Sequence, residues 1–265
     1  MQPLQDDSAF EWIRIVRDRL SREKPRPDLN WPGIFVSDIM PEGFESYATI
    51  LHRFDANYDE IDNPLSPSEH AILRIGDCEP LRSFIIQRRT ASSSPRIRWK
   101  ELAALFDVPY VPEISLMWFR RRMDSWCVSR LLNLFTDAWP AGEECEEVCT
   151  ILSKFTGRED CFFRLPSYYE YTHANQPMFY RGRLPEVTTF LRARPKRTVF
   201  EYWWPSDQRW CFCCETDIGA TVVGGPKDLI SALLASSQLE CIEVQPTTRV
   251  DNRVPIPDPP SLTKT

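Results

Sequence analysis

The chain has 265 residues, of which 42% are hydrophobic and 12% aromatic, so it is long enough to bury a substantial core. Its net charge of -6 and sequence pI near 5.3 argue against a protein whose main surface binds nucleic acid. No apolar run reaches the roughly 20 residues of a membrane span, and segment 1–7 lacks the basic and then apolar layout of a signal peptide. We therefore expect a cytoplasmic protein that does not enter a membrane.

The nine cysteines are an odd number with irregular spacing. A disulfide framework uses paired cysteines, and a reducing cytoplasm keeps thiols free. The sequence therefore predicts reduced cysteines. There is also no glycine-rich phosphate loop, and we expect no bound cofactor.

The N-terminal half, about 8–138, is expected to be mainly helical. Ser8 and Glu11 have the spacing of a capping box, which marks the start of a first helix. Three short runs, 34–36, 72–75 and 84–87, are strand candidates. The predicted helices of this half span 9–22, 44–51, 97–106, 114–123 and 128–138.

The C-terminal half, about 141–252, mixes predicted helices and strands. Acidic residues in the first turns favour a helix over 141–155, and Gly157 suits its C-terminal cap. The predicted strands span 161–164, 178–181, 201–204, 209–218, 221–223 and 240–244, and the other helices span 185–191 and 226–234. The proline-rich tail 253–265 is expected to be disordered.

The stretch 201–218 is predicted to form a hairpin with a turn at Pro205-Ser206-Asp207-Gln208. Side chains alternate between two faces after the turn. The buried face is expected to hold Trp210, Phe212, Cys214, Thr216 and Ile218. The face that is solvated or holds a site is expected to contain Arg209, Cys211, Cys213, Glu215 and Asp217.

These elements predict an α+β fold. We expect one compact domain over 1–252, with a mainly antiparallel sheet built on 199–223 and helices packed on one face. The helical N-terminal half is expected to wrap this sheet.

Two adjacent tryptophans suggest a binding surface. Only one of Trp203 and Trp204 can face inward on a regular strand, and an exposed tryptophan is typical of an interaction hot spot. Charged side chains of the turn and return strand would extend that surface. The predicted partner-binding residues are Trp203, Trp204, Asp207, Arg209, Glu215 and Asp217.

Catalysis is the alternative. Glu215 and Asp217 lie two apart on a predicted strand, and paired carboxylates can bind a hard metal or divide acid and base work. A hydrolase, with or without a divalent metal, would use these acids with His173 or His52. The competing interpretation is a solvated acidic face paired with arginines, and we favour a binding role over an enzyme.

Four cysteines raise the possibility of a zinc site. Cys145 and Cys149 share a predicted helix face, and Cys211 and Cys213 share a strand face. Neither pair has the two-residue spacing of a zinc knuckle, and the helix pair lies in an apolar stripe. We therefore expect no metal.

The arginine-rich segments 88–89, 96–100, 120–122 and 192–197 are interpreted as solvated faces, so nucleic-acid binding is not expected.

Several motifs of the C-terminal half occur together. They are Trp-Trp-Pro-x-Asp-x-x-Trp-Cys at 203–211, Glu-x-Asp at 215–217, Val-Val-Gly-Gly at 222–225 and Leu-Ile-x-x-Leu-Leu at 229–234. This pattern resembles a family of uncharacterised bacterial proteins common in actinobacteria and planctomycetes. The resemblance is strong over 160–251 and patchy before it; the family's Trp-x-Gly stretch is replaced here by 168–173. It implies a fold, and a small accessory protein of immunity-type or regulatory role would suit the family.

We therefore expect a bacterial, cytoplasmic, non-catalytic interaction module with an unidentified protein partner.

Overall fold

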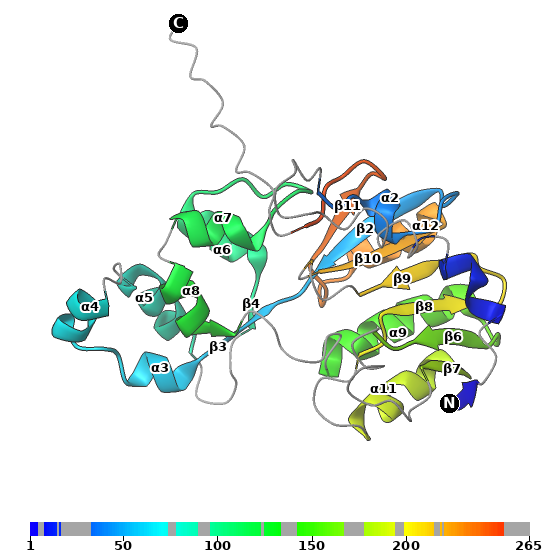
Figure 1. The fold of residues 1–265 in the computed structure, drawn as a ribbon, viewed down its shortest axis with the longest axis horizontal. Helices are drawn as coiled ribbons and strands as arrows, with labels where there is room; N and C mark the ends of the chain where they lie inside the picture. Colours follow the sequence, from blue (N-terminus) through cyan, green and yellow to red (C-terminus); the bar gives the residue numbers. More distant parts are fainter. Residues whose placement is uncertain are drawn as a thin grey trace, which may run out of the picture. The chain divides into compact units, whose positions relative to one another are not determined.

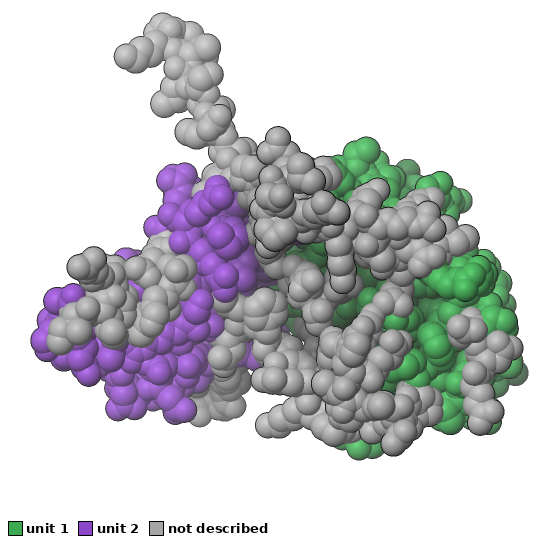
Figure 2. All heavy atoms as spheres, viewed as in Figure 1, with its two compact units in different colours: residues 1–52, 135–250 green, residues 53–134, 251–265 purple. Residues whose placement is uncertain are grey.

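The computed structural model describes residues 1–4, 8–14, 16, 33–73, 78–89, 96–122, 125–133, 142–166, 178–193, 199–214, 218 and 220–251. The chain divides into two compact units, which Figure 2 distinguishes by colour. Unit 1 comprises residues 1–52 and 135–250, and unit 2 comprises residues 53–134 and 251–265. The sequence predicts one domain over 1–252; in the structure, residues 1–52 group with the C-terminal half. The predicted disordered tail 253–265 lies outside the described residues.

Unit 1 is built on an eight-stranded sheet with the order β1-β7-β6-β8-β9-β10-β2-β11 (Figure 1). Each neighbouring pair of strands in this sheet is antiparallel. The strands are β1 (Gln2–Leu4), β2 (Ser46–Leu51), β6 (Cys161–Arg164), β7 (Phe179–Gly182), β8 (Tyr202–Pro205), β9 (Cys211–Cys213), β10 (Ala220–Gly225) and β11 (Cys241–Val244). The predicted α+β fold with a mainly antiparallel sheet is confirmed.

The longer helices of unit 1 pack on one face of this sheet, as predicted. They are α9 (Gly142–Thr156), α11 (Leu184–Arg192) and α12 (Lys227–Ala235), and α9 contacts both of the others. Leu152 and Leu233 of these helices share one core cluster with Trp203 and Phe212 of the sheet. Gly157 follows α9 with a φ of 65°, a left-handed conformation that glycine adopts readily at a helix C-terminus.

The opposite face of the sheet is covered as well. Phe10, at the end of the 3-10 helix η1 (Ser8–Phe10), packs there with Ile39 of α2 (Val36–Ile39). They form a second core cluster with Trp204 and Cys211 of the sheet. Since neighbouring residues of a strand point to opposite faces, Trp203 lies in the first cluster and Trp204 in the second.

Several local predictions are wrong. The strand candidate 72–75 begins in helix α4 (Pro67–Leu73), and the predicted helix 128–138 contains strand β5 (Leu132–Asn133). Residues 44–51 are predicted to be helical, but 46–51 form strand β2, which pairs with β10 and β11. The strand candidate 84–87 lies in helix α5 (Glu79–Arg88). The strand candidate 34–36 contributes only an isolated bridge between Phe35 and Arg249.

Unit 2 is mainly helical, as predicted for this part of the chain. A short sheet, β4 (Arg96–Ile97), β3 (Phe54–Ala56) and β5 (Leu132–Asn133), accompanies the helices. Besides α5, the helices are α3 (Tyr58–Asp62), α4 (Pro67–Leu73), α6 (Trp99–Phe106), α7 (Leu116–Arg122) and α8 (Ser125–Leu131). The Trp99 ring packs against Phe54 and Phe119, with ring centroids 5.0 and 5.5 Å away.

A disulfide joins Cys78, which precedes α5, to Cys127 of α8, with 5.4 Å between their Cα atoms. The prediction that the cysteines are reduced is therefore wrong for this pair. The two cysteines are 49 residues apart, so no local spacing reveals them, and the packing of α5 against α8 brings them together. The other seven cysteines are free. No helix in the described part of the chain is both long and apolar enough to span a membrane.

Candidate functional site

The candidate site lies at the turn of the predicted hairpin, in unit 1. Strands β8 and β9 pair antiparallel, with Tyr202 opposite Cys213 and Trp203 opposite Phe212, which confirms the hairpin. The Gln208 backbone N–H donates to the Pro205 carbonyl at 3.0 Å and closes the turn. Both strands are buried, whereas residues 206–209 are exposed.

Charged contacts hold the turn in place. The Asp207 carboxylate accepts a hydrogen bond from the Arg209 backbone N–H at 3.2 Å and forms an ion pair with the Arg209 guanidinium. Arg209 also donates to the Phe155 carbonyl at 3.1 Å and lies 3.5 Å from Glu159 Oε1. The hydrogen bond and charge of Asp207 raise the pKa of Arg209. The turn is thus tied to the C-terminal end of α9.

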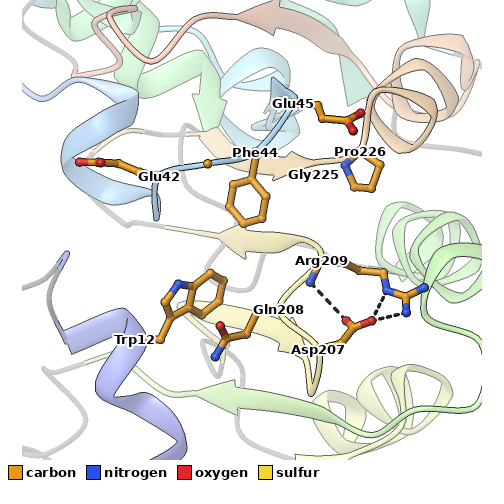
Figure 3. Close-up of a pocket in the computed structure, with 10 residues that line it drawn as sticks. Trp12, Glu42, Phe44, Glu45, Asp207, Gln208, Arg209, Gly225 and Pro226 are labelled. Atoms are coloured by element: carbon orange, nitrogen blue, oxygen red, sulfur yellow. Dashed lines mark hydrogen bonds and ion pairs between the residues drawn. The ribbon is translucent and has the colours of Figure 1, made fainter.

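A hollow of about 400 Å³ opens beside this turn (Figure 3). It is lined by Trp12, residues 42–45, residues 207–209 and the pair Gly225-Pro226, and we name it the hairpin-turn pocket. Its lining comes from four separate segments of unit 1: the helical turn 11–14, the loop before β2, the turn before β9, and the end of β10 with the residue that follows it. Figure 3 shows the Phe44 ring above Trp12 and Gln208, with Asp207 and Arg209 to the lower right.

The position of Phe44 depends on a glycine. A Cβ atom at Gly224 would lie 2.4 Å from Phe44 Cδ2 and 2.9 Å from Tyr47 Cε1, so only glycine leaves room for both rings over β10. The Phe44 ring meets Trp12 in an edge-to-face arrangement, with centroids 6.2 Å apart. Both rings are half-buried, so each keeps an accessible surface.

The Glu45 carboxylate, which lines the pocket, is also held in place by a hydrogen bond. Glu45 Oε2 accepts a hydrogen bond from the Lys227 backbone N–H, the first of α12, at 3.0 Å. A carboxylate at a helix N-terminus is favoured by the helix dipole and satisfies an otherwise unpaired amide. Glu45 therefore caps α12 while it lines the pocket.

The structure divides the predicted partner-binding residues into three groups. Asp207 and Arg209 are exposed and line the hairpin-turn pocket. Trp203 and Trp204 are 0% and 1% exposed, so the prediction that one of them faces outward is wrong. The reason is that both faces of the sheet are covered. The prediction that Cys211 and Cys213 lie on a solvated face is wrong for the same reason, because both are buried in the second core cluster. Glu215 and Asp217 lie outside the described residues.

Of the catalytic candidates, only His52 belongs to the described residues. Glu215, Asp217 and His173 lie outside them. His52 is half-buried after β2, with Nε2 3.0 Å from the hydroxyl of buried Thr221. Burial lowers the pKa of His52 to about 3, so its ring is neutral at pH 7.

The four cysteines proposed as zinc ligands cannot converge. Cys145 and Cys149 belong to the core on the helical face of the sheet, and Cys211 and Cys213 belong to the core on the other face. No group of three or more histidine, cysteine or acidic side chains in the described residues is placed to hold a metal ion.

Four of the thiols outside the disulfide are also poorly suited to chemistry. Burial raises the pKa of Cys161 and of Cys241 to about 12, and it raises that of Cys211. The hydrogen bond with Cys149, together with burial, raises the pKa of Cys145. These side chains are therefore protonated at neutral pH, and the protonated thiol is a poor nucleophile and metal ligand.

Of the residues that line the pocket, sequence reasoning identified only Asp207 and Arg209; it missed the others, among them Trp12, Glu42, Phe44 and Glu45. One signal was present for Trp12, because it lies off the apolar stripe of Phe10, Ile13 and Val16. A tryptophan outside such a stripe indicates an aromatic ring at a surface. Phe44 had no comparable signal.

Comparison of the chain with protein-family models, with curated proteins and with solved structures found no match. The candidate site therefore depends on the geometry alone.

Proposed function

We propose that this protein is a non-catalytic interaction module, of immunity type or regulatory, that binds a protein partner through the hairpin-turn pocket. The observation that supports the proposal is the pairing of an exposed, charged turn with two half-buried aromatic rings at one hollow. Aromatic and arginine side chains are enriched at protein interfaces and provide most of their hot spots.

The rigidity of the turn favours binding. Asp207 and Arg209 are held by each other and by α9, and the arms of the hairpin are buried on both faces. A surface that is already ordered loses little conformational entropy when a partner docks.

Cytoplasmic location and lack of nucleic-acid binding belong to the same proposal. Seven free cysteines support a reducing compartment, and the Cys78–Cys127 disulfide counts against it. Arginines of the basic segments form ion pairs with carboxylates, which supports the interpretation as solvated faces. These pairs are Arg88–Glu101, Arg89–Asp62, Arg96–Asp55 and Arg192–Glu146.

Partner capture with matched variants tests the proposal. The pocket variant is Trp12→Ala with Asp207→Ala. The control is Ile86→Ala with Gln87→Ala, which also removes one exposed apolar and one exposed polar side chain, but in unit 2. We expect the unmodified chain and the control to retain the same protein, and the pocket variant to retain at least tenfold less while its melting temperature stays close to that of the unmodified chain.

The captured protein is then purified and its affinity measured directly with all three chains. Equal affinity for the pocket variant and the control would show that the partner docks elsewhere, and the proposal would fail.

A further inference from the structure

The hairpin-turn pocket combines aromatic rings with more negative than positive charge. Among its described lining residues, three carboxylates, those of Glu42, Glu45 and Asp207, accompany one guanidinium, that of Arg209. The rings of Trp12 and Phe44 lie nearly perpendicular to each other, at an interplanar angle of 78°. A hollow with this lining attracts a ligand that is both cationic and able to lie against a ring.

The two features that would attract an anion are already engaged by the protein's own acids. Arg209 is paired with Asp207 and lies 3.5 Å from Glu159 Oε1, and it also donates to a backbone carbonyl. The first amide of α12 is bound by Glu45. An anionic ligand would therefore have to displace a carboxylate and would meet the remaining ones at short range.

We infer that the hairpin-turn pocket receives a lysine or arginine side chain of the protein partner, an inference that rests on the proposed function. The aliphatic part of such a side chain lies against Trp12 and Phe44, and its charged end donates to the carboxylates of Asp207 and Glu45. A hydrogen bond between a cation and a carboxylate is stronger than one between neutral groups. The volume of about 400 Å³ is sufficient for one long side chain.

Tryptophan NMR of the full chain tests the charge preference without an identified partner. The protein has nine tryptophans, and labelling them with nitrogen-15 gives indole N–H signals of which Trp12 is assigned through Trp12→Phe. The probes are the N-acetyl methylamides of arginine and lysine. The neutral analogues of citrulline and norleucine and the acidic analogue of glutamate serve as controls of similar length.

We expect both basic probes to shift the Trp12 signal at millimolar concentration, at least fivefold more than the neutral and acidic probes do. The shift should fall at least threefold in Glu45→Gln with Asp207→Asn, and it should weaken at high salt because salt screens the attraction. The signals of buried Trp203 and Trp204 should stay in place in every titration, which also shows that the variant is folded.

Equal shifts with the basic and the neutral probes, or a larger shift with the glutamate probe, would overturn the inference. An unchanged shift of the Trp12 signal in Glu45→Gln with Asp207→Asn would also overturn it. The two proposals fail separately. If Trp12→Ala with Asp207→Ala loses partner binding but the basic probes do not shift the Trp12 signal, the proposed function stands and the inferred cationic ligand is wrong. If the basic probes shift the Trp12 signal but the same variant binds the partner as well as the unmodified chain does, the proposed function fails.

Discussion

The two units of this chain use different means of stabilisation. Unit 1 buries an antiparallel sheet on both faces, and its seven cysteines are free thiols, most of them buried. Unit 2 has short helices around a small aromatic group, and it adds a disulfide. The difference indicates that a sheet covered on both sides is stabilised sufficiently by apolar burial, whereas a small helical unit buries less and is stabilised further by a cross-link.

The same contrast appears within the hairpin of unit 1. Its arms are buried and stabilise the unit, and its turn is exposed and lines the hairpin-turn pocket. Substitutions in the arms should therefore change stability, and substitutions in the turn should change binding.

The largest expected effect is on stability, in the core of unit 1 that covers both faces of its sheet. Trp203→Ala and Trp204→Ala should each lower the free energy of unfolding by about 3 to 5 kcal/mol, because each deletes a fully buried ring. Chemical denaturation followed by circular dichroism measures both. Gln208→Asn, an exposed change in the turn to a residue that tolerates the positive φ of 58°, should stay within about 0.5 kcal/mol. A small cost for Trp204→Ala alone would mean that the second face is open to solvent.

The next effect is confined to unit 2. Reduction of Cys78–Cys127 should destabilise this unit by about 2 to 4 kcal/mol, because the bond closes a long loop of the unfolded chain. Hydrogen exchange measured segment by segment should show faster exchange in α6 and α8 after reduction and no change in β8 and β10. A count of nine thiols in the denatured, non-reduced protein would contradict this prediction.

The third effect is a pH dependence of unit 1. The pKa of His52 is about 3 in the folded chain against an ordinary value of 6.5, so the unfolded chain takes up the proton first. The contribution of neutral His52 to the free energy of unfolding is therefore fully present above pH 6.5, and it is lost progressively as the pH falls from 6.5 toward 3. Between pH 7 and 5 the unmodified protein should lose about 1 to 2 kcal/mol more than His52→Gln, measured by denaturation at each pH. Parallel curves for the two proteins would show that His52 does not titrate as described.

The smallest effect concerns the ion pairs of unit 2. Glu101→Gln removes the charge that faces Arg88 at 2.9 Å, but it retains an oxygen for the Arg98 backbone N–H at the start of α6. A half-exposed pair of this kind is worth less than about 1 kcal/mol. A double-mutant cycle with Arg88→Gln measures the coupling directly. A coupling well above that value would mean that ion pairs stabilise unit 2 as much as its disulfide does.

The sequence predicts elements whose cause is local. Pro205, Ser206 and Asp207 are residues that favour a turn, and the acidic start and glycine end of α9 mark its boundaries. The sequence predicts a helix in place of strand β2 because Phe44, Tyr47, Ala48 and Leu51 recur at helical spacing. A strand that is buried on both faces loses the alternation by which strands are recognised.

The candidate site, too, can be predicted from the sequence only in part. Asp207 and Arg209 can be identified from the turn itself, and both line the pocket. Trp12 and Phe44 come from segments more than 160 residues earlier in the chain, so no spacing connects them with the turn.

The sequence by itself determined the hairpin, its charged turn and the α+β class, because turns, caps and strand preferences depend on neighbouring residues. Only the tertiary structure decided that Trp203 and Trp204 are both buried, that Cys78 meets Cys127, and that two distant rings lie beside the turn. The physical reason is that exposure and pairing depend on what covers each face, and the covering segments come from remote parts of the chain.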